Sequence, residues 1–341
     1  MRTDVGTLLA TFPPGTRLKL GLYVAAQTVL ALLDTVGVAA VLPLVQVLTG
    51  GSMQDGPIGV LHQIFGAPDR SSFVIYLAVV VVAAFTLKNV AALALQWWSS
   101  GLVALLQVRT SARLLRAFLA EPFLSHKARG GAPEINRTIV VAVGDAHTKV
   151  LGGLLLLIGD ALSTLAIFVL VTYLIPIPSL VAAAYFGIAV FVLQRVLAHA
   201  NRRVGVEAQQ RSYTSGKALM EACLGFREIR MHNASPFFTR RYRDEATAAA
   251  MVGRKAGFLA ALPKNLLEVT TIVGIVLVIM VIMATSSGVA ATAPLALFVT
   301  AAIKLLPNMT RLTTTMGIIR SGEAGLRLAV ETLSTFTREE L

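Results

Sequence analysis

Ionisable side chains interrupt several long apolar stretches of this 341-residue chain, and their chemistry there is unusual. The residues are Asp34, Lys88, Asp160, Glu268 and Lys304. A charge in a hydrocarbon environment is costly, so it usually pairs with an opposite charge or faces a polar pathway. We expect Lys88 to pair with Asp160, and Lys304 to face Glu268 or a central cavity. A structural pair and a pathway role both stand as interpretations of these residues.

Three arginines gather where one apolar stretch ends. Arg195 interrupts that stretch, and Arg202 and Arg203 follow within two helical turns. Positive charge at a membrane edge suits a pyrophosphate or another anionic headgroup. Contact with ordinary anionic lipid is an equally good interpretation.

Residues for enzyme chemistry do not gather in a recognisable pattern. The five histidines lack metal-ligand spacing, so we expect no metal site, and the single cysteine, Cys223, excludes an intramolecular disulfide. A phosphate-binding Gly-x-x-x-x-Gly-Lys-Ser/Thr loop is absent, because the Gly216-Lys217 pair is followed by Ala218. The chain alone is therefore not expected to be an enzyme or to bind a cofactor.

The elements that must position these residues follow from composition. Hydrophobic residues make up 55% of the chain and charged residues 14%, whereas soluble domains carry about a quarter charged residues. The apolar residues form runs long enough to cross a bilayer, which takes roughly 20 residues. We therefore predict an all-α membrane protein with six transmembrane helices, at about Leu20–Leu48, Phe73–Leu95, Val150–Ile175, Leu180–Val196, Leu266–Ala284 and Ala293–Leu312.

The basic residues predict the orientation. Segment 96–149 holds seven lysines and arginines and segment 195–265 holds thirteen, whereas 49–72 holds only Arg70. The positive-inside rule places the basic segments and both termini in the cytoplasm, and the chain in the inner or plasma membrane. The net charge of +12 thus reflects topology and contact with membrane lipid, and we expect no nucleic-acid partner.

The helices are expected to extend well beyond the lipid. Ser179 to about Tyr213 reads as one helix without proline, and at 1.5 Å per residue it is about 50 Å long. The hydrocarbon core is about 30 Å thick. We therefore divide the chain into a leader or elbow helix, a six-helix domain with two cytoplasmic loops, and a linker, at 1–19, 20–320 (loops about 107–149 and 197–263) and 321–341. A disordered leader is the alternative to an elbow.

Several motifs occur in an order typical of one family. The first span carries Leu33-Asp34-Thr35-Val36-Gly37 and Leu42-Pro43-Leu44. Further motifs, in chain order, are Arg113-Leu114-Leu115-Arg116, Glu121-Pro122-Phe123, Arg137-Thr138-Ile139, Gly225-Phe226-Arg227-Glu228-Ile229-Arg230, Phe237-Phe238 with Tyr242, Lys304-Leu305-Leu306-Pro307, Arg320-Ser321-Gly322-Glu323-Ala324 and Val330-Glu331-Thr332-Leu333. Over about residues 5–335 the chain resembles the transmembrane domain of ABC exporters.

The resemblance implies a function and a set of working residues. Leu262-Pro263 with Leu267-Glu268 and the Lys-Leu-Leu-Pro element are most similar to exporters of lipid-linked oligosaccharides. The family implies a homodimer or heterodimer, an amphipathic or lipid-linked substrate, and MgATP bound to an ATPase domain expected beyond Leu341 or on a separate subunit. It also implies two coupling helices, at Glu121–Lys127 and Ser212–Leu224. Their candidate residues are Glu121, Pro122, Phe123, His126, Ser215, Leu219 and Glu221.

Other interpretations of the same features stand beside this one. The coupling helices are alternatively solvated hairpin tips. The whole chain is alternatively a scaffold or receptor that docks a cytoplasmic partner through its long helices without transporting anything. A passive channel is the weakest alternative, because the cytoplasmic extensions would then have no task.

Overall fold

The computed structural model describes residues 2–10, 12–39, 70–122, 131–174, 176–285 and 292–339. Within these ranges every regular element is a helix, and η1 and η2 are π-helices. The elements are α1 (Arg2–Ala10), α2 (Pro14–Ala39), α5 (Arg70–Ala120), α7 (Ala132–Asn136), η1 (Arg137–Ala142), η2 (Asp145–Gly152), α8 (Gly153–Leu174), α9 (Pro176–Leu224), α10 (Phe226–Met231), α11 (Ser235–Thr285) and α12 (Thr292–Glu339).

Five helical segments in the described residues are long and apolar enough to cross a membrane. They lie in α2, α5, the α7–α8 segment, α9 and α11, where the first five spans are predicted. The chain is thus a helical, multi-pass membrane protein. The sixth predicted span falls in α12, where the side chains up to Leu306 lie outside the described residues.

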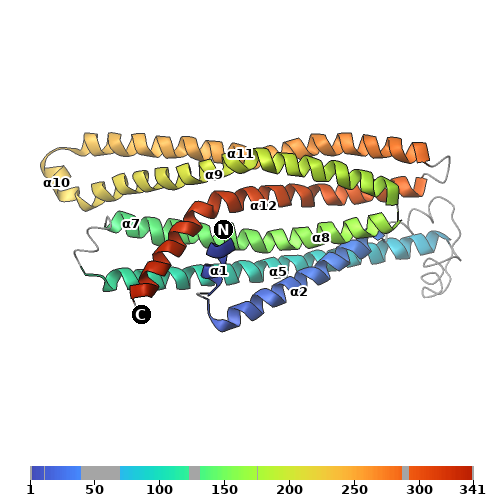
Figure 1. Ribbon diagram of the computed structural model, residues 1–341, viewed down its shortest axis with the longest axis horizontal. Coiled ribbons are helices and arrows are strands. Elements are labelled where there is room, and N and C mark those ends of the chain that lie inside the picture. Colours follow the sequence, from blue (N-terminus) through green and yellow to red (C-terminus); the bar gives the residue numbers. More distant parts are fainter. Residues whose placement is uncertain are drawn as a thin grey trace.

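Four helices are much longer than a bilayer is thick. α5 and α11 contain 51 residues each, α9 contains 49 and α12 contains 48. At 1.5 Å per residue each measures about 72–77 Å, more than twice a hydrocarbon core. The helices lie side by side in an elongated bundle (Figure 1). The helices are therefore longer than a bilayer is thick, as predicted. Helix α9 continues 11 residues beyond the predicted end at Tyr213.

Helix α12 runs through the middle of the bundle and joins its parts. It packs against α8, α9, α11 and η2, while α2 packs against α8 and α5. Near its C-terminal end α12 bends away from α9 and crosses over α5 (Figure 1). The most buried hydrophobic cluster lies here and includes Leu114, Val143, Leu326 and Phe336. The most extensive buried packing of the bundle therefore lies toward its α10 end. The four residues named here are all outside the predicted spans.

Helix α1 is part of this cluster. Its Leu8 is only 1% exposed and packs with Leu114 and Leu333. The leader therefore contains a helix that packs on the bundle.

Close backbone packing joins α12 to α9 and η2. A Cβ on Gly205 would lie 2.5 Å from the backbone oxygen of Ser321, and one on Gly322 would lie 2.8 Å from Lys149 Cβ. Polar contacts surround this junction: Arg202 pairs with Glu323 at 3.0 Å, and Arg320 donates to Gln194. Burial, followed by repulsion from Arg202, lowers the pKa of Arg320 below its usual range. The junction is thus closely packed and linked by charged hydrogen bonds.

The hairpin between α9 and α11 turns later than the sequence predicts. Ser212–Leu224, the expected coupling helix, forms the last turns of α9, and the chain breaks only at Gly225. α10 follows, and Asn233 adopts a left-handed φ of 52° before α11 begins. Gly216 does not end α9, because an interior glycine only weakens a helix by about 1 kcal/mol. We call Leu224–Phe237 the hairpin tip.

Candidate functional site

A polar cavity of about 460 Å³ lies between α2, α5, α8 and α12. Almost all its lining residues fall within predicted spans, with Gln96 just outside. The polar ones are Tyr23, Gln27, Asp34, Lys88, Asn89, Gln96, Asp160, Ser163, Asn308 and Arg311. Small-molecule sites usually have volumes of about 300–1,000 Å³. A cavity of this size and polarity among apolar helices is the strongest candidate site in the described residues.

An ion pair between α2 and α5 forms one wall. Lys88 Nζ lies 2.6 Å from Asp34 Oδ1, and the two side chains are only 13% and 9% exposed. The predicted pairing of Lys88 with Asp160 is therefore wrong. Lys88 reaches α2 because α5 and α2 are direct neighbours, whereas Asp160 on α8 finds a different partner.

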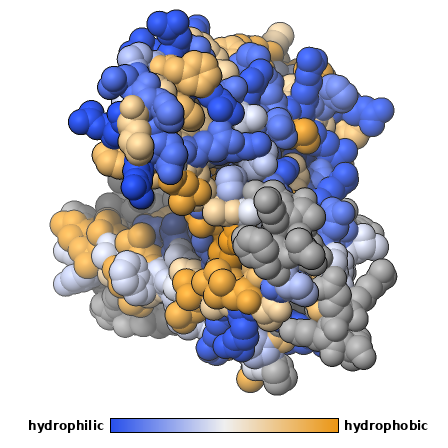
Figure 2. All heavy atoms as spheres, turned by 90° about the vertical axis from the view of Figure 1, so that its left-hand side faces the viewer, coloured by the Kyte–Doolittle hydropathy of each residue, from blue (hydrophilic) through white to orange (hydrophobic). Residues whose placement is uncertain are grey.

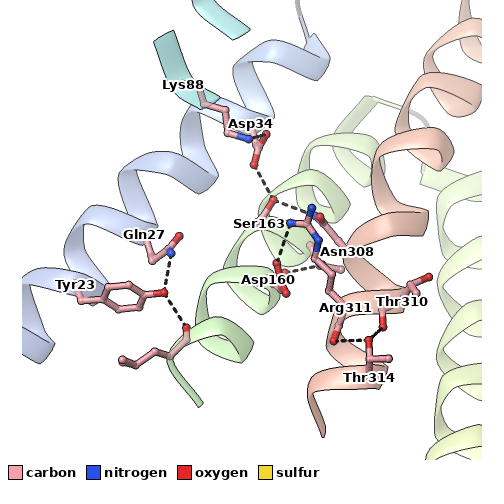
Figure 3. Close-up of polar contacts among 12 residues, drawn as sticks. Tyr23, Gln27, Asp34, Lys88, Asp160, Ser163, Asn308, Thr310, Arg311 and Thr314 are labelled. Carbon is pink, nitrogen blue, oxygen red and sulfur yellow. Dashed lines mark hydrogen bonds and ion pairs between the residues drawn. The ribbon is translucent and has the colours of Figure 1, made fainter. Parts of the chain in front are cut away.

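A hydrogen-bonded chain extends from this pair across the cavity (Figure 3). Ser163 on α8 donates to Asp34 Oδ2 at 3.1 Å, and Asn308 on α12 donates to the Ser163 hydroxyl at 3.1 Å. Asp34, Ser163 and Asn308 are all buried. The four helices are thus connected by side chains whose polar groups satisfy one another, as buried polar groups require.

A second, looser pair lies one helical turn away. Arg311 on α12 approaches Asp160 on α8 at 4.0 Å, with the arginine side chain 69% exposed and the aspartate 17% exposed. The cavity therefore contains two acidic and two basic side chains in opposite-charge pairs.

The end of the cavity nearest the α10 end carries aromatic and amide groups. Tyr23 donates to the Leu155 backbone oxygen at 3.2 Å, and Gln27 donates to the Tyr23 hydroxyl at 2.9 Å. Tyr23 is almost fully buried. These contacts fix Gln27 at the cavity wall, where its remaining amide groups can meet a ligand.

The other predicted pathway residues lie elsewhere. Glu268 is exposed on α11, and the side chain of Lys304 lies outside the described residues, so their pairing stays a prediction. Arg195 and Arg203 are exposed on α9, and no acidic side chain in the described part of the chain pairs with them. Arg202 pairs with the buried Glu323 and lines none of the described cavities. Of the charges expected within the spans, Asp34, Lys88 and Asp160 line the cavity, and Asp34 and Lys88 pair there.

The candidate coupling residues fall into two groups, at the end of α5 and at the end of α9. Glu121 and Pro122 follow the end of α5, while Phe123 and His126 lie outside the described residues. The other three candidates, Ser215, Leu219 and Glu221, lie on the last turns of α9.

Within that second group, Glu221 pairs with Arg241 of α11 at 2.9 Å. Leu219 is 47% exposed and Ser215 is half-buried. Glu221 thus links the two arms of the hairpin, just before its tip.

Sequence reasoning missed the uncharged polar residues of the cavity. Ser163, Asn308 and Gln27 carry no charge, so a search for intramembrane charges passes over them. The available signal is spacing: Asp160 and Ser163, like Asn308 and Arg311, are three residues apart and share one helix face. Polar pairs at this spacing within an apolar span indicate an inward-facing stripe.

No protein-family model matches this chain, and no curated protein is significantly similar to it. In the described residues no group of three or more histidine, cysteine or acidic side chains could hold a metal ion.

Proposed function

We propose that this chain is the membrane-spanning part of an ATP-driven exporter. The cavity then forms part of the path of an amphipathic or lipid-linked substrate, and the hairpin tip docks on an ATPase outside these 341 residues, which binds MgATP. A homodimer or heterodimer would enclose the full path. The chain would lie in the inner or plasma membrane with both termini in the cytoplasm.

The observation that carries the proposal is the physical connection between cavity and tip. α9 leads from the membrane to the tip, and the Arg202–Glu323 pair joins α9 to α12. α12 in turn carries Asn308 and Arg311 into the cavity. Because packed helices shift as rigid bodies, a force at the tip can reach the cavity through this route.

The surface of the tip supports docking on a protein. Leu224, Phe226, Met231 and Phe237 are 64–74% exposed, about 40 Å along the bundle from the predicted end of the fourth span. Lipid cannot cover them there. In the upper part of Figure 2, which is the α9–α11 hairpin, hydrophobic residues are exposed among mainly hydrophilic ones. Exposed apolar patches of this kind mark interaction surfaces.

The test is to reconstitute the chain with the ATPase encoded beside it or fused to it, and to measure vanadate-sensitive ATP hydrolysis in lipid vesicles. Phe226→Asp should reduce binding of the ATPase by more than about tenfold, because it places a charge in a desolvated contact. Val206→Asp is the matched control: Val206 lies on α9, outside the tip, and is exposed to a similar degree as Phe226. Circular dichroism establishes that both variants are folded.

The rival function, a docking scaffold without transport, predicts a different result. A scaffold would bind its partner through the same tip, but the partner would not hydrolyse ATP in response to the membrane chain. If no ATPase is encoded with the chain or associates with it, the exporter proposal is wrong.

A further inference from the structure

A second hollow continues the cavity toward the α10 end. It has a volume of about 320 Å³ and lies between α5 and the η2–α8 segment. Gln96 and Leu156 line both spaces, so the two lie next to each other. Its far end is marked by Gln107 and Thr148, whose side-chain oxygens lie 3.4 Å apart. Thr148 is exposed, so the hollow reaches the surface there.

One face of α5 supplies most of the polar groups along this route. Asn89, Gln96, Ser100 and Gln107 follow one another at intervals of seven, four and seven residues. Side chains at these intervals lie on the same side of a helix. All four line the cavity or the hollow, so together they form a polar track on α5.

The track differs in charge from the rest of the chain. None of the described residues that line the second hollow is charged, although the whole chain carries a net charge of +12. In the cavity the charged side chains form opposite-charge pairs. An ionic group in contact with these side chains would exchange water for uncharged partners or for charges that are already paired, which is costly. Hydroxyl and amide groups, by contrast, would find amide and hydroxyl partners throughout.

We infer that the polar track is the entrance by which the head group of the substrate reaches the cavity, and that it selects an electrically neutral head group rich in hydroxyls or amides. The inference rests on the proposed function and adds to it the side of access and the chemical class. It moves recognition away from Arg195, Arg202 and Arg203, which suit an anion but do not line the track.

Single cysteines introduced along the track test whether water reaches it. Cys223, the single cysteine, is exposed in the last turn of α9, next to the hairpin tip, and replacing it with serine gives a cysteine-free chain. Ser100→Cys and Gly152→Cys then place a thiol in the track. Gly152 has room for a side chain, since a Cβ there would lie 3.5 Å from the His147 backbone oxygen, an ordinary van der Waals distance. Leu87→Cys is the control, on the lipid side of α5, where Leu87 is 72% exposed.

Labelling would use a membrane-impermeant methanethiosulfonate reagent on inside-out vesicles. If the track is water-filled, both track cysteines should react roughly tenfold faster than Leu87→Cys, because the thiolate needs water contact to form. Equal, slow reaction at all three positions would overturn the inference.

A second measurement tests the chemical class. Decyl maltoside, decyl phosphate and decyltrimethylammonium share a tail but carry neutral, anionic and cationic head groups. Decyl maltoside should slow labelling of Ser100→Cys by about threefold or more at a concentration where the charged probes have no effect. Stronger protection by decyl phosphate, or equal protection by all three, would overturn the selection of a neutral head group. Neither measurement involves an ATPase, so failure here is distinct from failure of tip docking.

Discussion

The cavity and the hairpin just before its tip each contain a short ion pair, in opposite surroundings. Asp34 and Lys88 lie 2.6 Å apart and are 9% and 13% exposed, whereas Glu221 and Arg241 lie 2.9 Å apart and are 33% and 45% exposed. The distances are similar, so burial makes the difference. A buried charge that loses its partner stays uncompensated, whereas an exposed one gains water. Loss of one partner should therefore destabilise the buried pair much more than the partly exposed pair.

The cavity and the tip also differ in where their polar and apolar residues lie. The cavity is a polar interior among helices whose apolar faces meet lipid, while the tip exposes Leu224, Phe226, Met231 and Phe237 among polar residues. We interpret the first as a site for a polar ligand and the second as a contact for a protein. Four substitutions test this comparison, in order of decreasing effect.

Lys88→Met should have the largest effect, because it leaves Asp34 charged and buried without its ammonium partner. We expect a loss of about 3–5 kcal/mol in the free energy of unfolding. Thermal unfolding of the purified protein measures it. The double variant Lys88→Met with Asp34→Asn should recover most of the loss, and a single variant as stable as wild type would contradict a buried pair.

Gly205→Val tests the junction that joins the two regions. Its Cβ would lie 2.5 Å from the Ser321 backbone oxygen, so α9 and α12 must move apart. We expect a loss of about 1–3 kcal/mol and weaker coupling of the tip to the cavity. Gly216→Val is the matched control on the same helix, where nothing lies within 4 Å. Equal stability of the two variants in thermal unfolding would show that the junction is not closely packed.

Ser163→Ala removes the hydroxyl between Asp34 and Asn308. Since the amide of Asn308 then loses its acceptor in a buried place, we expect a loss of about 1–2 kcal/mol. Chemical unfolding of the variant beside Ser212→Ala, an exposed serine on α9, measures the difference. An effect no larger than that of the control would mean that the hydrogen-bonded chain does not stabilise the bundle.

Glu221→Gln should have the smallest effect. Both partners at the hairpin are partly exposed and screened by water, so the expected change is less than about 0.5 kcal/mol. The same unfolding assay applies, with and without 1 M salt, where the Debye length falls to about 3 Å. A loss as large as that of Lys88→Met would remove the contrast between the two regions.

The positions of the helices could be predicted from the sequence, because the length of an apolar run is a local property. Five predicted spans overlap helices of the structure, although residues 40–48 of the first lie outside the described residues. The length of α9 beyond its span follows from the absence of proline before the tip. The position at which α9 ends could not be predicted from the sequence. Both Gly216 and Gly225 are isolated glycines in the sequence, yet only Gly225 follows the end of α9.

The cavity could be predicted only in part. Asp34 and Lys88 were found because charges stand out in apolar runs. The pairing of Lys88 with Asp34 could not be predicted, because it depends on how α2, α5 and α8 are rotated about their axes. The π-helices η1 and η2 carry no signal in apolar periodicity or charge, and η2 places Asp145 and Lys149 against Gly322 and Gly325 of α12.

One measurement on the unmodified chain tests the orientation on which the tip and the track both depend. Cys223 is exposed at the hairpin and is the only cysteine, so a membrane-impermeant maleimide reports directly on which side of the membrane it lies. A cytoplasmic tip predicts no labelling in intact cells and full labelling once the membrane is permeabilised. Labelling of Cys223 in intact cells would place the tip outside and contradict both proposals.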